Sequence, residues 1–220
     1  MLLTFLYHQV GLGKYTNTLS LLDKQFSYLS QNFPIVVPGD LLMPFSTSIC
    51  LTFDDATEDF YHEVFPLLKK YQIKALLAVP VSLVETPNYC SWQMLREVSQ
   101  SRLVKIASHS MSHAVLTNPE VDYCFELTAS KKILENQLQT KVDTFVYPFG
   151  KFSQSIHKEA KKHYRYIMRI GSSCNFSWNN FHHLHYRIPS DNLSHYLENL
   201  TLLKKIKYFF NFLKNTIRLR

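Results

Sequence analysis

Short apolar runs alternate with amphipathic stretches along most of this chain. The apolar runs have the length of strands and cover residues 1–8, 48–53, 73–79, 103–107, 144–147, 166–170 and 184–188. Between them, apolar positions recur at helical spacing over residues 18–31, 58–71, 91–99, 118–139 and 153–163. A shorter apolar run at 35–37 predicts one more strand. This alternation of strands and helices is typical of an α/β fold with a mostly parallel sheet.

Two prolines refine the helix predictions. Pro66 lies inside the stretch 58–71, so we expect a kink or a shorter first segment there. Pro119 favours a helix that begins at Asn118-Pro119-Glu120, because proline is well tolerated at the first helical position.

The composition is that of one globular domain. The chain has 220 residues, only five glycines and no low-complexity segment or visible repeat, so it can bury a full core. Cys50, Cys90, Cys124 and Cys174 are widely spaced, which favours reduced thiols in a cytoplasmic protein, although four cysteines could also pair. Residues 1–10 lack a basic segment and a small-residue cleavage site, so no signal peptide is predicted.

Two adjacent carboxylates, Asp54 and Asp55, follow the apolar run 48–53. Successive side chains of a strand point to opposite faces, so the two can act together only if the chain turns there. After such a turn, one carboxylate could bind a cation while the other stays free as a base. The alternative is a capping role for the helix that follows, because Asp is a favoured N-cap residue.

Two histidines, His109 and His113, follow the apolar run 103–107. On a helical turn this spacing places both imidazoles on one side, where they can bind one metal ion. With one carboxylate they would form a set that leaves coordination positions open for water and substrate. Taken alone, the pair could equally be a solvated helix start.

Three motifs together resemble the polysaccharide deacetylases, the NodB-homology domain of carbohydrate esterase family 4. They are Thr-Phe-Asp-Asp at 52–55, His-Ser-x-x-His at 109–113 and Phe-Val-Tyr-Pro-Phe-Gly at 145–150. The resemblance covers roughly residues 1–195 and implies a distorted (β/α) barrel of about seven strands. Its active site would lie at the carboxyl ends of the strands. The segment 5–10, with Tyr7-His8, is similar to a permuted branch that includes poly-N-acetylglucosamine deacetylases.

The resemblance implies a role for each candidate residue. One divalent metal ion would be held by Asp55, His109 and His113. Zinc is the favoured ion, and the same ligands would accept cobalt, nickel or ferrous iron. Asp54 would be the general base and His8 the general acid. The substrate and oxyanion loop would consist of Tyr147, Pro148, Phe149 and Gly150, with the backbone N–H of Phe149 facing the oxyanion.

The sequence also departs from the family pattern. Val146 stands where the third motif has an arginine that orients the catalytic Asp, which leaves open what orients Asp54. No fourth motif is visible near residues 176–179, and a late Leu-x-His is not clearly present. His183 and His185 are therefore alternative general acids, although a polar loop or strand edge is the favoured interpretation of that cluster.

Residues 201–220 carry Lys and Arg but no acid, and they supply six of the chain's seven net positive charges. The basic residues are Lys204, Lys205, Lys207, Lys214, Arg218 and Arg220. Leu, Ile and Phe recur among them at helical spacing, so a basic amphipathic helix that binds an anionic membrane surface is predicted. The alternative is a helix packed on the barrel with a solvated basic face. The stretch is too charged to span a bilayer, and no nucleic-acid motif accompanies it.

These observations predict a catalytic domain at 1–200 and a C-terminal helix at 201–220. The chain is expected to be a metal-dependent hydrolase that removes N-acetyl groups from an amino sugar in a polysaccharide or lipid-linked glycan precursor. It would be cytoplasmic and peripheral at the inner membrane face. The alternatives are a non-catalytic glycan-binding protein on a degenerate deacetylase fold and a deformylase of a lipid-linked amino sugar.

Overall fold

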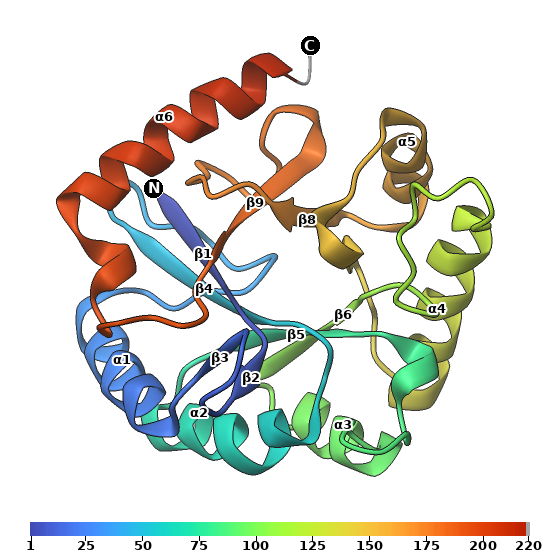
Figure 1. The fold of residues 1–220 in the computed structure, drawn as a ribbon, viewed down its shortest axis with the longest axis horizontal. Helices are drawn as coiled ribbons and strands as arrows, with labels where there is room; N and C mark the ends of the chain where they lie inside the picture. The colour runs from blue at the N-terminus through green and yellow to red at the C-terminus, as the bar shows by residue number, and fades with distance from the viewer. Residues whose placement is uncertain (219–220) are drawn as a thin grey trace.

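Seven parallel strands form a closed barrel at the centre of the molecule (Figure 1). The computed structural model describes residues 1–218, apart from the side chains of Phe181 and Arg218. Around the barrel the strands are β1 (Leu2–Tyr7), β4 (Ser48–Phe53), β5 (Ala75–Val79), β6 (Val104–Ser108), β7 (Thr144–Val146), β8 (Tyr166–Ile170) and β9 (Leu184–Pro189). The barrel closes where β1 pairs with both β4 and β9. The predicted α/β barrel of about seven strands is confirmed.

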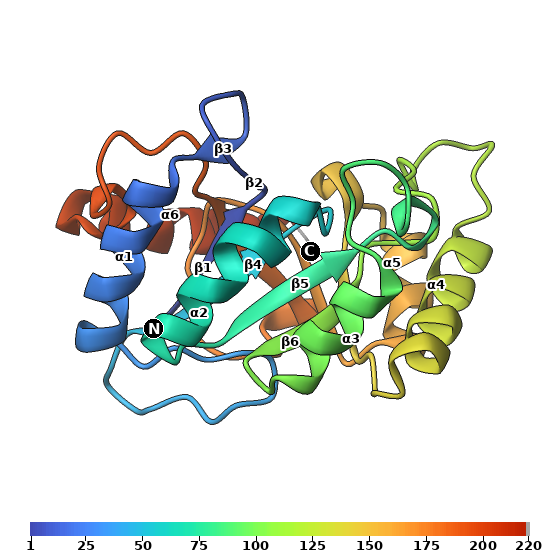
Figure 2. The same ribbon diagram turned by 90° about the horizontal axis from the view of Figure 1, so that it is seen from below.

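Helices pack around the outside of this barrel (Figure 2). The α-helices of the described residues are α1 (Leu19–Asn32), α2 (Phe65–Tyr71), α3 (Trp92–Gln100), α4 (Tyr123–Leu138), α5 (Gln154–His163) and α6 (Leu202–Arg218). Four of them begin where a short polar side chain accepts a backbone N–H of the first turn. These N-cap residues are Thr18, Ser91, Asp122 and Ser153.

Side chains along each strand point alternately outward and inward, so the molecule has one core between the barrel and the helices and a second core inside the barrel. Outward-facing residues such as Phe53, Leu77 and Phe145 pack with the helices, and inward-facing residues such as Leu76 and Met168 fill the barrel. The barrel interior also contains fully buried polar side chains, namely Thr4, Thr52, His185 and Arg187. Because all seven strands are parallel, the residues that follow them meet at one end of the barrel.

Three local predictions need correction or refinement. The run 35–37 forms only an isolated bridge, through Ile35, and is not a strand. The helix predicted from residue 118 begins at Tyr123, because Asp122 accepts the N–H of Phe125 and caps it there. The stretch 58–71 contains one π-helical turn, Phe60–Val64, before α2, so the expected interruption near Pro66 is present.

All four cysteines are free thiols. Cys50, Cys90 and Cys174 are buried, whereas Cys124 is exposed on α4. The prediction of thiols in place of a disulfide framework agrees with this arrangement.

The helix α6 packs on the barrel by part of its surface only. Tyr208 and Phe212 are buried, and Asn211 and Asn215 donate hydrogen bonds to carbonyl groups of the loop after β8. The predicted helix is therefore present as far as it is described, while Arg220 lies outside the described residues. Within residues 1–218, no helix combines the length and the apolar character needed to cross a bilayer.

Candidate active site at the carboxyl end of the barrel

The two carboxylates after β4 diverge because the chain turns sharply there. Asp55 and Ala56 both have positive φ angles, of 72° and 52°. Asp54 is consequently buried below the barrel mouth, whereas Asp55 is partly exposed at it. The expected turn at the end of this strand is present.

The loop after β6 brings the two histidines together, but not on a helical turn as expected. Ser110 and His113 have positive φ angles of 68° and 58°, which is incompatible with a helix. The loop is held by Glu126 of α4, whose carboxylate accepts the N–H groups of Met111 and Ser112 and the hydroxyl of Ser112. A buried carboxylate on a neighbouring helix, and not helical spacing, therefore places the His pair.

The side chains of Asp55, His109 and His113 converge at the barrel mouth. Their donor atoms lie within 4.8 Å of one another, a separation at which one metal ion could contact all three. The Oδ1 atom of Asp55 is 3.3 Å from Nε2 of His113 and 3.7 Å from Nε2 of His109. This Oδ1 is buried and has no hydrogen-bond partner among the described residues. Such an orphaned carboxylate oxygen between two imidazoles fits a cation-binding site.

The imidazole of His109 is oriented by the backbone of β7. Its Nδ1 lies 2.8 Å from the carbonyl oxygen of Val146, so Nδ1–H donates and Nε2 is free to act as a ligand. Burial is the main influence on the pKa of His109 and lowers it, in spite of the nearby Asp54 and Asp55 charges. A neutral imidazole is the form that binds a metal.

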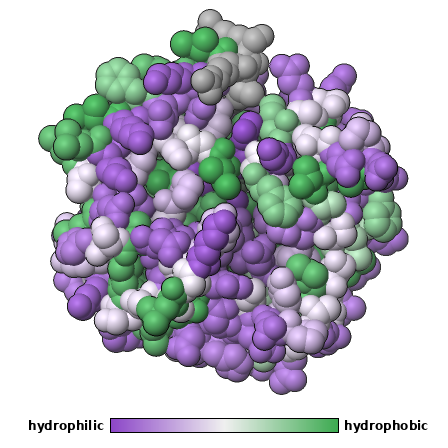
Figure 3. All heavy atoms as spheres, in the orientation of Figure 1, coloured by the Kyte–Doolittle hydropathy of each residue, from purple (hydrophilic) through white to green (hydrophobic). Residues whose placement is uncertain are grey.

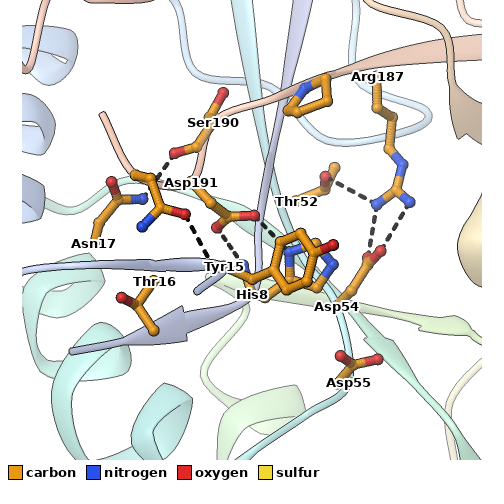
Figure 4. Close-up of polar contacts among 12 residues, drawn as sticks. His8, Tyr15, Thr16, Asn17, Thr52, Asp54, Asp55, Arg187, Ser190 and Asp191 are labelled. Carbon is orange, nitrogen blue, oxygen red and sulfur yellow. Dashed lines mark hydrogen bonds and ion pairs between the residues drawn. The ribbon is translucent and has the colours of Figure 1, made fainter. Parts of the chain in front are cut away.

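Asp54 is bound in bidentate fashion by Arg187 of β9, as Figure 4 shows. Nη1 of Arg187 is 2.6 Å from Oδ1 of Asp54, and Nη2 is 2.8 Å from Oδ2. Burial alone would raise the pKa of Asp54, but the Arg187 charge and hydrogen bonds lower it to about 2. The carboxylate is thus ionised and fixed in orientation. Arg187 therefore orients Asp54, although Val146 stands where the family motif has an arginine.

His8, at the end of β1, is paired with Asp191 in the segment after β9 (Figure 4). Its Nδ1 is 2.6 Å from Oδ2 of Asp191, and its backbone N–H donates to Oδ1 at 3.0 Å. Burial on its own lowers the pKa of His8, but the bond to Asp191 and the charge of Asp54 raise it overall. Register places this histidine beside Asp54, whose N–H donates to the carbonyl of Tyr7.

The loop after β7 forms one side of the site. Phe149 is exposed, with a φ angle of 56°, and its ring centroid is 4.6 Å from that of His113. Gly150 has a φ angle of 64°, and a Cβ atom there would lie 3.1 Å from Ile170. Pro148 is buried, and the ring of Tyr147 is buried among the outward-facing aromatic residues. The Pro148–Gly150 turn therefore presents backbone and Phe149 to the metal-ligand cluster.

The alternative general acids lie elsewhere. His185 is fully buried in the barrel, where Nε2 is 2.6 Å from the hydroxyl of Thr4 and the ring stacks on Trp178. Burial lowers its pKa to about 3. His183 is exposed on the short turn before β9. Among the described residues, neither forms a hydrogen bond or ion pair with the candidate site. The polar-loop interpretation fits His183, whereas His185 is inside the barrel and not at a strand edge.

Two residues of the site were missed in the sequence. Arg187 is the one Lys or Arg residue of the predicted strand 184–188, and a charge at a buried strand position is the signal that could have identified it. Asp191 lies in a polar loop and gives no such signal.

The sequence model of the family described as polysaccharide deacetylase matches residues 45–167, which include the acid pair, the His pair and the 147–150 loop. The matched range does not include His8, Arg187 or Asp191. His8 directly follows β1, Arg187 is in β9 and Asp191 follows β9, and the closed barrel brings all three to the same mouth.

Individual proteins agree with this match. YxkH of Bacillus subtilis, named for the polysaccharide deacetylases, is 25% identical over 171 residues, 71% of this chain and 60% of that protein. The poly-β-1,6-N-acetyl-D-glucosamine N-deacetylase of Escherichia coli K12 is 27% identical over 195 residues, 65% of this chain and 29% of its own length. The chain thus spans 60% of the first relative and 29% of the second, less than two thirds of either.

A solved structure shows the same fold. The crystal structure of a polysaccharide deacetylase from Bacillus cereus has a TM-score of 0.82 and 20% identity, over 90% of this chain and 67% of that chain. Since the family model matches more than half of its residues, this chain belongs to the polysaccharide deacetylase family.

Proposed function

We propose that this chain is a metal-dependent N-deacetylase that acts on an N-acetylated amino sugar of a glycan. The observation that carries the proposal is the placement of an ionised, arginine-bound Asp54 next to the Asp55, His109 and His113 cluster. His8, held by Asp191, lies close enough to Asp54 for the charge of that carboxylate to raise the pKa of His8. A base, a metal-ligand set and an acid thus share one barrel mouth.

The donor set fits one divalent ion. Two imidazole nitrogens and one carboxylate oxygen suit zinc, and also cobalt, nickel or ferrous iron. When bound, such an ion would lower the pKa of water and polarise the acetamide carbonyl.

The residues of the chain divide the proton transfers between them. Asp54 is ionised and accepts the proton of the attacking water. Its orientation is fixed by Arg187, so this acceptor is held ready in one position. The bond to Asp191 raises the pKa of His8, which favours the protonated imidazole, and this imidazolium donates a proton to the leaving amine. The backbone N–H of Phe149 stabilises the developing oxyanion.

Arg187 bears on the alternative of a non-catalytic glycan-binding protein. That reading was motivated by the missing motif arginine at Val146, and an arginine from β9 now binds the same Asp carboxylate. A deformylase would use the same groups on a smaller acyl chain, so only substrate assays separate it from a deacetylase.

The proposed substrate is reached at a membrane surface, in a polysaccharide or a lipid-linked precursor. The support is α6, whose apolar side chains Leu203, Phe210 and Ile217 are more than half exposed, with lysines beside them. Figure 3 shows hydrophobic residues along the edge of the molecule that α6 forms. Anionic lipid would attract each lysine by about 1 kcal/mol.

One experiment tests the core of the proposal. Metal content and acetate release from N-acetylglucosamine oligomers are measured for the wild type, Asp55→Ala and Asp54→Asn. We expect one metal per wild-type chain, loss of metal in Asp55→Ala, and retained metal without turnover in Asp54→Asn. A wild type that binds no divalent ion after reconstitution would exclude the proposed mechanism.

A further inference from the structure

A row of polar side chains crosses the outer face of the barrel on three neighbouring strands. Tyr147, just past the end of β7, lies beside Arg169 of β8, which in turn is paired in register with Tyr186 of β9. No α-helix lies between β8 and β9 in the chain, so this outer face is bordered by α5 and α6 (Figure 1). Tyr147 and Tyr186 are buried there, whereas Arg169 is partly exposed.

Two cavities open along this row, and both are lined by Phe152 and Gln154. One has a volume of about 410 Å³ and is lined by His157, Lys158, Lys161 and His182. The other has a volume of about 270 Å³ and includes Arg169, Tyr186 and Asn215 of α6. No Asp or Glu of the described residues lines either cavity. The combined pocket is consequently electropositive without a compensating acid.

One lining residue of each cavity has a buried polar atom without a partner. Nδ1 of His157, in the larger cavity, and Nε of Arg169, in the smaller one, are buried and have no hydrogen-bond partner among the described residues. The His157 side chain is nearly fully buried, at 5% exposure. The Arg169 guanidinium lies over the Phe152 ring, 5.0 Å from its centroid. Such unpaired atoms are unusual, because buried polar groups are normally bonded.

The pocket adjoins the proposed catalytic loop. Phe152 follows that loop by two residues, and its ring centroid is 5.8 Å from Tyr147 and 5.3 Å from His157. At the other side of the loop, Phe149 contacts the ring of His113. A substrate that reached the catalytic groups could therefore extend past this loop into the pocket.

We propose that this pocket binds a phosphate-type oxyanion carried by the glycan substrate. Arginine offers a planar fork of donors to such an anion, and lysines add charge without fixed geometry. The inference rests on the proposed deacetylase function and narrows its substrate to an anionic, phosphorylated amino sugar or glycan.

The test compares two charge-matched double variants. Lys158→Ala/Lys161→Ala removes two exposed pocket lysines, and Lys132→Ala/Lys141→Ala removes two exposed lysines that do not line the pocket. Binding of N-acetylglucosamine 1-phosphate is measured by calorimetry in the metal-loaded Asp54→Asn background, where turnover cannot interfere. We expect about tenfold weaker binding for the pocket variant and no change for the control.

Turnover and vesicle binding then identify the source of the anion. We expect kcat/KM on N-acetylglucosamine 1-phosphate to fall about tenfold in the pocket variant, while neutral N-acetylglucosamine oligomers are cleaved as by the wild type. Unchanged binding of the phosphorylated sugar in the pocket variant would overturn the proposal. The proposal would also be overturned if the pocket variant lost only its binding to phosphatidylglycerol vesicles. That result would assign the pocket to lipid headgroups. The calorimetric binding measurement tests the pocket even if the wild type cleaves neither sugar. A failure of the proposed deacetylase activity can therefore be told apart from a failure of the pocket proposal.

Discussion

The guanidinium of Arg187 and the carboxylate of Asp54 form a two-point ion pair across the interior of the barrel. The two N–O distances are 2.6 and 2.8 Å, and both side chains are buried. The hydroxyl of Thr52 also accepts from Arg187, at 3.3 Å. Because β9 and β4 lie on either side of β1, the ion pair depends on closure of the barrel.

Replacing Arg187 with Met is expected to destabilise the fold and abolish activity. The variant leaves Asp54 buried without a cation, which typically costs about 3–5 kcal/mol of unfolding free energy. Urea unfolding at neutral pH measures this loss. The control is Arg96→Met, on the exposed surface of α3, which should change stability little. Equal stability of the two variants would contradict the importance of the ion pair.

In Arg187→Met, the contribution of Asp54 to the pH dependence of stability should change sign. In the wild type the Asp54 pKa is lowered from 3.8 to about 2, so its stabilisation is complete above pH 4 and is lost as the pH falls toward 2. Without Arg187, burial raises the pKa of Asp54. Its contribution would then favour the folded state below pH 4 and fade as the pH rises through the raised pKa. Unfolding curves from about pH 2 to pH 7 distinguish the two slopes.

The role of Asp191 can be tested through the pH profile of the reaction. Asp191→Asn keeps the shape of the side chain but removes the charge that helps to raise the pKa of His8. If His8 is the general acid, the alkaline limb of kcat/KM should move to lower pH. The control is Asp143→Asn. Asp143 lies just before β7, away from the barrel mouth, and its carboxylate pairs with Lys105. An alkaline limb that stays in place would argue against His8 as the acid.

The sequence predicts the barrel well, because its strands are short apolar runs and its helices carry clear caps such as Ser91 and Ser153. The predicted metal ligands also converge, since each follows a parallel strand. The residues that pair with Asp54 and His8 from other parts of the barrel are harder to predict. Arg187 and Asp191 are more than 130 residues from Asp54 and His8 in the chain, and only barrel closure brings them together. The His pair was likewise assigned to a helical turn because the Glu126 contact is not visible in local spacing.

Glu126 should control metal affinity without contacting the metal. Its carboxylate accepts three hydrogen bonds from Met111 and Ser112, in the loop between the two histidines. Glu126→Gln puts an NH₂ donor where one of these bonds needs an acceptor. The loop between His109 and His113 therefore loses part of its support. Loss of such supporting contacts typically costs 10–100-fold in metal affinity or activity. Competition with a zinc chelator measures this, with the exposed Glu120→Gln as the control. Unchanged zinc affinity would show that the loop is held by other contacts.

The outward apolar stripe of α6 gives the last prediction. Leu203, Phe210 and Ile217 are spaced by seven residues, so at 100° per residue they lie on one side of the helix. Tyr208 and Phe212 are buried and lie on the opposite side, against the barrel. A helix with one apolar side packed and a second one exposed is suited to an additional surface, and the absence of acid in residues 201–218 favours an anionic one.

Replacing the three outward residues with Ser should therefore reduce binding to phosphatidylglycerol vesicles and leave the fold intact. Lys207→Gln/Lys214→Gln, next to the stripe, should weaken the same binding by roughly fivefold per lysine and reduce its salt dependence. The matched control is Leu12→Ser/Leu19→Ser/Phe125→Ser, three exposed apolar residues on other elements. Vesicle sedimentation reports binding, and circular dichroism confirms folding. Equal binding by the α6 variant and its control would mean that α6 is a packed terminal helix with a solvated basic face.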